Sequence, residues 1–156
     1  MKRVGLISDT HGLMRPEALT ALAGVDQIIH GGDIGGPEIL DALQRIAPVT
    51  AVRGNNDKDA WARKIAEHEV LDVDGSLLYV LHDLKELDLD PATSGFTAVI
   101  TGHSHKPVID ERNGVLFVNP GSAGPRRFKL PISVGFLELR RGRWSARIQE
   151  LAISAS

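Results

Sequence analysis

Apolar runs and segments of helical spacing alternate along the first third of the chain. The apolar runs predict strands over Arg3 to Ser8, Gln27 to His30 and Val49 to Val52, and the spacing predicts helices over Pro16 to Ala23 and Pro37 to Ile46. A proline begins each helix. This position tolerates proline because N–H groups in the first turn have no partner within the helix. An order of strand, helix, strand, helix, strand indicates a parallel sheet with right-handed crossovers.

The remainder of the chain is rich in strands and in hairpin turns. Three times, two apolar runs flank a short polar turn that contains glycine, and a further short strand is expected at Val99 to Thr101. The pairs are Val70 to Val73 with Leu77 to Leu81, Val108 to Glu111 with Val115 to Val118, and Ser133 to Leu139 with Ser145 to Leu151. We therefore expect two sheets packed face to face with helices outside, in a single domain over residues 1–156.

Nearly every predicted strand ends in Asp, His or Asn, often beside a glycine. In open α/β sheets, the carboxyl ends of the strands are the place where ligands bind. The strand ends supply seven oxygen and imidazole donors from five segments: Asp9, His11, Asp33, Asn55, His82, His103 and His105. Such a donor set without thiolates suits manganese, iron, zinc or nickel, and seven donors suffice for two cations with open positions.

Each motif also has a simpler explanation when it is taken alone. Asp9-Thr10-His11 is compatible with a turn or a helix N-cap, and Gly31-Gly32-Asp33 is compatible with a plain turn. Asn55-Asn56 suits a turn that tolerates left-handed backbone. The two histidines of Gly102-His103-Ser104-His105 face one site only if the turn between them is irregular. The common placement at strand ends favours a metal site over coincidence.

As a set, these motifs resemble the pattern of the calcineurin-like metallophosphoesterases, which is D-x-H, GD, GN-[HCN]-D, H and GH-x-H. The match runs from residue 4 to about residue 122. The compact length and the Asn119 to Ser122 stretch resemble the small phosphodiesterase branch of that family. The resemblance implies an α/β fold, a four-layer αββα sandwich in which two mixed sheets are flanked by helices.

The resemblance also implies roles for the seven donors. One divalent cation would take Asp9, His11, Asp33 and His105, the second would take Asp33, Asn55, His82 and His103, and Asp33 would bridge the two. A hydroxide held between the cations would attack the phosphorus in line. Asp33, Asn56 and His103 are the expected catalytic residues, and manganese is the expected metal, with nickel, iron or zinc as alternatives.

Two positions depart from the family pattern. Asn56 stands where many relatives carry a histidine that is thought to help the leaving group depart. An amide donates a hydrogen bond but cannot protonate an alkoxide, which favours diesters over monoesters. Asp83 stands where relatives usually have glycine. Its carboxylate is expected to be solvated, to support His82 from behind, or to ligate the second metal directly.

Composition and charge narrow the class of partner. The net charge is −2, and seven basic residues against two acidic ones lie from Arg126 onward. This balance makes nucleic acid an unfavoured partner, although the basic end could steer an anion. No apolar stretch approaches the ~20 residues that cross a membrane. Since the chain has no cysteine, a cytoplasmic location is expected.

The sequence therefore predicts a two-metal phosphodiesterase that acts on small or nucleotide-like phosphodiesters, with a small-molecule substrate and a homodimer as the default assembly. A phosphomonoesterase and a nuclease are the alternatives on the same site. A non-catalytic binding scaffold similar to a retromer subunit is the alternative of a different class. That subunit kept the family's sandwich and lost metal ligands, whereas all seven donor positions are filled in this chain.

Overall fold

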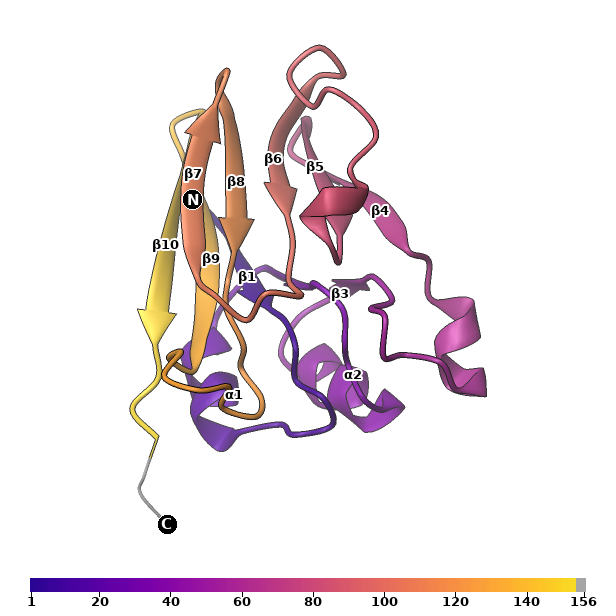
Figure 1. The fold of residues 1–156 in the computed structure, drawn as a ribbon. Coiled ribbons are helices and arrows are strands. Elements are labelled where there is room, and N and C mark those ends of the chain that lie inside the picture. Colours follow the sequence, from indigo (N-terminus) through magenta and orange to yellow (C-terminus); the bar gives the residue numbers. More distant parts are fainter. Residues whose placement is uncertain (154–156) are drawn as a thin grey trace.

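The computed structural model describes residues 1–153, which form two five-stranded sheets packed face to face (Figure 1). The first sheet has the order β10-β9-β1-β2-β3 and the second has the order β4-β5-β6-β8-β7. The strands are β1 (Lys2–Ile7), β2 (Gln27–His30), β3 (Val49–Ala51), β4 (His68–Val73), β5 (Ser76–Leu81), β6 (Phe96–Ile100), β7 (Val108–Arg112), β8 (Val115–Asn119), β9 (Ser133–Arg140) and β10 (Arg143–Glu150).

Both sheets are mixed, as predicted. In the first, β1 pairs parallel to β2 and β2 parallel to β3, while β9 and β10 add an antiparallel hairpin beside β1. In the second, β5, β6 and β8 run parallel, while β4 and β7 pair antiparallel at the two edges. The three predicted hairpins are all present. Each turns through two residues with positive φ, as at Asp74 (50°) and Gly75 (88°), which is the geometry that matches strand twist.

The parallel strands place their carboxyl ends at a common edge of each sheet. Ile7 pairs with His30, and His30 with Ala51, so β1, β2 and β3 end side by side. In the second sheet Val80 pairs with Ile100, and Ile100 with Val118. The loops after these strands carry the polar motifs, so the pairing alone gathers the motifs of each sheet.

A dry core between the sheets holds the two edges in register with each other. Fully buried side chains from the first sheet, such as Leu6 and Ile29, pack there against Leu78, Val80 and Ile100 of the second. A second core lies under the helices α1 (Pro16–Leu22) and α2 (Pro37–Gln44), which cover the outer face of the first sheet (Figure 1). Burial of this apolar surface is the main force that positions the strand ends.

The outer face of the second sheet has a thinner cover than the expected helical layer. Between β5 and β6 lie the short 3₁₀ helix η2 (Leu84–Glu86) and a loop, and no α-helix occurs there. The sequence of this connection alternates leucine with acidic residues and contains Pro91, so it lacks the period of a helix. Its apolar side chains Leu84, Leu87 and Leu89 still pack on the sheet.

A further 3₁₀ helix, η1 (Ala60–Lys64), lies between β3 and β4 and was not predicted. Its Trp61 packs against the core under α1 and α2, but the segment is too short to show a period in the sequence. Within residues 1–153, no helix has the length and apolar character needed to cross a membrane.

Candidate metal centre

The seven predicted donors lie together where the carboxyl edges of the two sheets meet. Asp9 and His11 follow β1, Asp33 follows β2 and Asn55 follows β3. The second sheet supplies the others: His82 directly after β5, and His103 and His105 after β6. Residues that are up to 96 positions apart in the sequence thus share one site.

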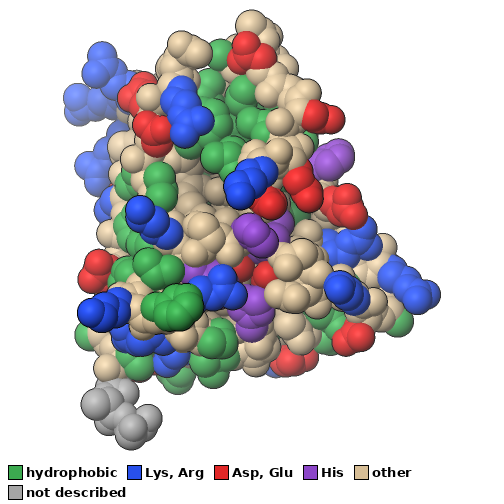
Figure 2. Space-filling model, in the orientation of Figure 1, with side chains coloured by type: hydrophobic (Ala, Val, Ile, Leu, Met, Phe, Trp, Pro, Cys, Tyr) green, Lys and Arg blue, Asp and Glu red, His purple; other side chains and the backbone are tan. Residues whose placement is uncertain are grey.

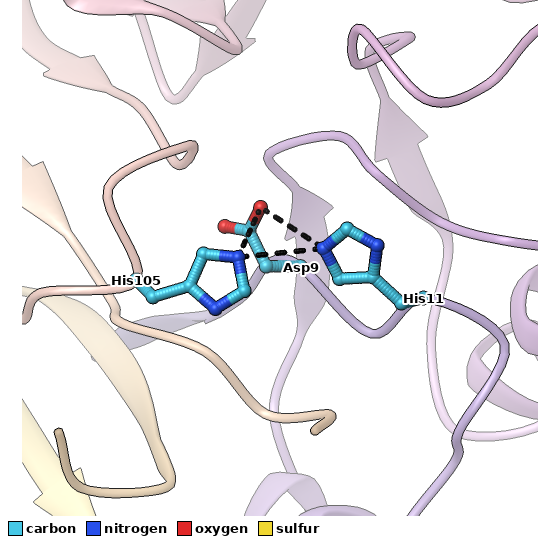
Figure 3. Close-up of side chains that lie close together, drawn as sticks. All are labelled: Asp9, His11 and His105. Atoms are coloured by element: carbon cyan, nitrogen blue, oxygen red, sulfur yellow. Dashed lines mark hydrogen bonds and ion pairs between the residues drawn. The ribbon is translucent and has the colours of Figure 1, made fainter. Parts of the chain in front are cut away.

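Asp9, His11 and His105 form the first cluster (Figure 3). The Oδ1 atom of Asp9 lies 3.8 Å from His11 Nε2 and 3.5 Å from His105 Nε2. The two imidazole nitrogens are 3.4 Å apart, with the rings stacked at 5.3 Å between centroids. Three donor atoms therefore point at one space from two different sheets.

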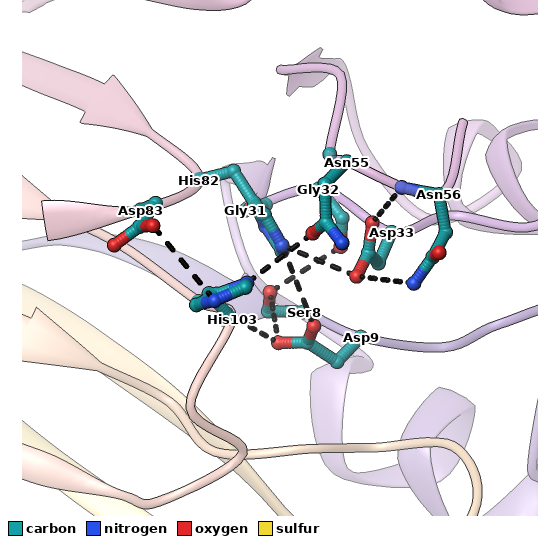
Figure 4. A network of polar contacts seen from close by, with 12 residues as sticks. Ser8, Asp9, Gly31, Gly32, Asp33, Asn55, Asn56, His82, Asp83 and His103 are labelled. Atoms are coloured by element: carbon teal, nitrogen blue, oxygen red, sulfur yellow. Dashed lines mark hydrogen bonds and ion pairs between the residues drawn. The ribbon is translucent and has the colours of Figure 1, made fainter. Parts of the chain in front are cut away.

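Asp33, His82 and His103 form the second cluster, with Asn55 beside them (Figure 4). Asp33 Oδ2 lies 3.2 Å from His82 Nε2, and Asn55 Oδ1 lies 3.2 Å from His103 Nδ1. The rings of His82 and His103 stand edge to face, 5.2 Å between centroids. An amide oxygen, a carboxylate and two imidazoles thus meet here.

Asp33 lies between the two clusters. Its Oδ2 atom is 3.7 Å from His11 Nε2 in the first cluster and 3.2 Å from His82 Nε2 in the second. Asp9 Oδ1 is also 3.9 Å from His82 Nε2. The clusters are therefore adjacent, as a pair of cations that share a carboxylate requires.

Buried donor atoms without a hydrogen-bond partner show that the site suits cations. Among residues 1–153, Asp9 Oδ1, His82 Nε2 and His105 Nδ1 are buried and make no hydrogen bond. Unpaired buried polar atoms are uncommon and call for an explanation such as an ion. The Asp9 and His82 atoms face the space inside the clusters, which is where a cation would satisfy them.

The outward nitrogen of His82 is fixed by the backbone. Its Nδ1 lies 2.7 Å from the carbonyl oxygen of Gly31, and because a carbonyl can only accept, Nδ1 carries the proton and donates. In the neutral ring this leaves the Nε2 lone pair directed at Asp33 and Asp9. Metal-ligating histidines are typically oriented by such a hydrogen bond from the other ring nitrogen.

The two carboxylates have opposite electrostatic environments. Burial raises the pKa of Asp9 and outweighs the opposing effects of His82 and of the hydrogen bond from Ser8. Burial also acts to raise the pKa of Asp33, but contacts with His82 and with the Asn56 N–H outweigh it and hold that pKa at about 2. Asp33 is therefore ionised at neutral pH, which is the state that a bridging ligand needs.

The affinity of the metal-free protein for manganese is expected to fall as the pH falls. Burial would lower the pKa of His82, but the Asp33 carboxylate, the Gly31 carbonyl and the charge of Asp9 raise it. A proton on Nε2 competes with a cation, so affinity rises with pH until the raised pKa of His82 is passed and then levels off. Calorimetric titration with manganese across a pH series measures this. A profile that is flat across the histidine range would contradict it.

Backbone conformation distinguishes these residues from ordinary turn residues. Five of the seven donors have positive φ: Asp9 (55°), His11 (47°), Asp33 (55°), His103 (74°) and His105 (62°). Such conformations cost of order 1–3 kcal/mol each and cluster at functional sites. The sequence motifs predicted irregular turns with glycine, but the structure places the strain on the donors themselves.

Two motif glycines are required by close approach. A Cβ atom on Gly54 would overlap the backbone nitrogen and the carboxylate of Asp33, and one on Gly102 would overlap the Ser8 hydroxyl. The loops after β2 and β3 of the first sheet could not come this near with a side chain at position 54, and the loops after β1 and β6 of the two sheets could not with one at position 102. The glycines of the GN and GH motifs are thus part of the geometry of the centre.

Ser8 and Asp57 support the site and were not assigned roles from the sequence. The Ser8 hydroxyl donates to Asp9 Oδ2 at 2.8 Å, and the His103 N–H donates to the same oxygen at 3.0 Å. The buried carboxylate of Asp57 accepts from the N–H groups of Ile34, Gly35 and Gly54, at 3.0 to 3.1 Å. Asp57 closes the GN-x-D motif, which is the signal that could have revealed it.

His30 has a structural role next to the site. It is fully buried, and burial lowers its pKa to about 3, so the ring is neutral. The Gly32 N–H donates to Nδ1, and Nε2 lies 3.0 Å from the hydroxyl of Thr10, which donates to the Ile34 carbonyl. His30 therefore connects the loop that carries Asp9 to the loop that carries Asp33 through hydrogen bonds.

The structure shows the contacts of Asn56 and Asp83, the two residues that depart from the family pattern. Asn56 donates from its backbone N–H to Asp33 Oδ1 at 2.9 Å and from its amide to Asp33 Oδ2 at 3.2 Å. Asp83 lies with Oδ2 3.8 Å from His103 Nε2, and its Oδ1 accepts from the N–H of Lys85 at the start of η2. Asp83 thus lies next to His103, a neighbour that none of the three alternatives from the sequence had named.

Two further stretches have local partners. Asn119 donates to the Gly102 carbonyl at 2.8 Å and to the hydroxyl of Ser104 at 3.1 Å, so it shapes the turn of the GH-x-H motif. Arg53, which precedes the GN motif, pairs with Glu67 at 2.9 Å. Arg127 is exposed, and its charge helps burial to lower the pKa of His105 to about 4.

The fold and the paired clusters define a class of metal-dependent phosphoester hydrolases, and the comparison of sequences agrees. Residues 1–142 match the model of the calcineurin-like phosphoesterase superfamily domain. The chain belongs to this family. Together with the two donor clusters, membership implies a divalent metal.

The chain is similar to several known proteins of this family and to solved structures of the same fold. A probable metallophosphoesterase of Methanocaldococcus jannaschii, MJ0623, is 38% identical over 128 residues, which cover 76% of this chain and 67% of that protein. A phosphodiesterase of the same organism, MJ0936, is 25% identical, with 95% and 99% of the chains covered. Among solved structures, Vps29 of Chaetomium thermophilum matches with a TM-score of 0.77 and 18% identity, over 97% of both chains. The last likeness concerns the fold alone.

Proposed function

We propose that this chain is a metal-dependent phosphodiesterase that hydrolyses small or nucleotide-like phosphodiesters by in-line displacement. The observation that carries the proposal is the pair of adjacent donor clusters in which the Asp9 Oδ1 and His82 Nε2 atoms are buried and unpaired. The name of the M. jannaschii phosphodiesterase supports the choice of diesters. We propose further that residues 1–156 act as one catalytic domain.

Two divalent transition-metal ions would be held by the seven donors, and manganese is the proposed metal, with nickel, iron or zinc as alternatives. The first ion would be held by Asp9, His11, Asp33 and His105, and the second by Asp33, Asn55, His82 and His103. The position of Asp33 Oδ2, within 3.7 Å of His11 Nε2 and 3.2 Å of His82 Nε2, supports its role as the bridge.

When bound, such ions neutralise charge on the phosphoryl oxygens and lower the pKa of water. The chain's own residues position the reaction. Asp33 stays ionised with a pKa of about 2, and Asn56 holds both of its oxygens. The Gly31 carbonyl directs His82 inward, and Asn55 orients His103. We propose that the Asn56 amide and His103 also contact the phosphoryl group of the substrate.

Hydrolysis of a bis-aryl phosphate is expected to exceed that of the matching mono-aryl phosphate, since Asn56 cannot protonate a poor leaving group. The test is a panel of bis(4-nitrophenyl) phosphate, 4-nitrophenyl phosphate and single-stranded DNA, each assayed with manganese, nickel, zinc and magnesium. Faster cleavage of the monoester would favour the phosphomonoesterase, and cleavage of DNA above the small diester would favour the nuclease.

The likeness to Vps29 keeps a binding scaffold as the candidate of a different class. All seven donor positions are filled and brought together, which supports the enzyme. Metal analysis of the purified protein separates the two: absence of bound metal, with no hydrolysis after manganese or nickel is added, would favour the scaffold. A small-molecule substrate, a homodimer and a cytoplasmic location stay predictions.

A further inference from the structure

A cavity of about 370 Å³ opens beside the second cluster, on the outer face of the second sheet. It lies where the cover between β5 and β6 stops short of β7. Leu84, Val108, Phe117 and Val118 form its apolar lining, and Figure 2 shows apolar side chains gathered in a recess next to the histidines. The cavity exists because this face lacks a full helical layer.

The cavity and the metal centre share a wall. Asp83, Gly102, His103 and Ser104 line the cavity, and His103 belongs to the second donor cluster. A phosphoryl group on the clusters would therefore have one of its substituents within reach of the cavity. This continuity connects the cavity to the substrate.

Arg112 and Asp110 pair with each other at the cavity rim, which Asp83 and Lys85 also line. Arg112 donates to Asp110 at 2.8 Å, and its guanidinium lies 4.9 Å above the ring of Phe117. Asp83 is engaged by the N–H of Lys85 and lies 3.8 Å from His103 Nε2. Ligand pockets are typically lined by apolar side chains with few polar groups, in volumes from roughly 300 Å³ upward. The apolar lining therefore favours an apolar or aromatic occupant.

We propose that this cavity binds one ester arm of the phosphodiester substrate, and that the arm is apolar or aromatic. The inference rests on the proposed function, because it requires a phosphoryl group on the donor clusters. A phosphomonoester has a single ester arm, which is its leaving group, so the arm that stays on phosphorus in a diester would be missing and the cavity would be left empty. Preference for diesters would then come from burial of the second arm as well as from Asn56.

The test is the affinity of the manganese-loaded protein for phenylphosphonate and for methylphosphonate, measured by calorimetry. Neither compound is a phosphoester, so the readout does not depend on turnover. The phenyl ring is expected to bind about tenfold tighter than the methyl group, from the additional apolar area that it buries. Equal affinity of the two phosphonates in the unaltered protein would overturn the cavity proposal and leave the metal centre intact.

A matched pair of variants on β7 locates the effect. Val108 lines the cavity, whereas Ile109 is the next residue of the same edge strand and does not line it; their exposed fractions are 39% and 44%. Val108→Asn is expected to reduce the tenfold preference to about twofold, and Ile109→Asn to leave it unchanged. An unchanged preference in Val108→Asn would count against the cavity. Failure of both phosphonates to bind would count against the proposed function itself.

Discussion

Replacing Asp33 with alanine is expected to lower the hydrolysis of bis(4-nitrophenyl) phosphate in manganese by on the order of 10³-fold or more. Asp33 Oδ2 is the atom that lies between the two clusters, and Asp33 is the carboxylate with a pKa held at about 2. Its loss removes one donor from each proposed ion at once. The bound manganese per chain is expected to fall in parallel, as measured by elemental analysis after gel filtration.

Asp41→Ala serves as the control for Asp33→Ala. Asp41 is an exposed carboxylate on α2, so the same change in charge is made far from the donor clusters. Activity and metal content should both stay at the level of the unaltered protein. Hydrolysis that survives in Asp33→Ala at a comparable rate would rule out the two-metal mechanism.

Replacing Asp57 with alanine is expected to lower the free energy of unfolding by about 3–5 kcal/mol. Its carboxylate is buried and accepts three backbone N–H groups, from Ile34, Gly35 and Gly54. Alanine would leave those donors without a partner, and the loops after β2 and β3 would lose their common anchor. Urea denaturation of the metal-free protein measures the change.

Two companion variants sharpen the Asp57 experiment. Asp57→Asn keeps one acceptor oxygen, so its loss of stability should lie between those of the alanine variant and the unaltered protein. Asp59→Ala alters an exposed carboxylate two residues further on and should change the unfolding free energy by less than about 0.5 kcal/mol. If Asp57→Ala were as stable as Asp59→Ala, the anchoring role would be wrong.

Most elements could be predicted because their patterns are local. Alternating and continuous apolar runs identified the strands of both sheets, and Asp74-Gly75 and Asn113-Gly114 identified two hairpins by their tolerance of positive φ. The turn at Arg141 also has positive φ, at 52°, and there glycine alone gave the signal. The short 3₁₀ helix η1 was missed because one turn of helix carries no period.

The candidate donors could be read from the sequence, but the hydrogen bonds that support them could not. A motif records which residue types follow a strand, whereas a hydrogen bond such as that from Ser8 to Asp9 depends on how the turn closes. Asp83 illustrates the limit. Its neighbour in sequence is His82, yet the imidazole near its carboxylate is that of His103, in the loop after β6.

The sequence by itself determined the alternating strands and helices of the parallel part of the first sheet, the hairpins, the seven candidate donors and the family. These features depend on local periodicity and on residue chemistry, which the chain carries in linear order. The tertiary structure decided which donors meet, because the core between the sheets sets the distance from Asp9 to His105 and from Asp33 to His82. It also decided that an apolar cavity opens next to His103, since a thin cover over one sheet face results from packing across strands that are distant in sequence.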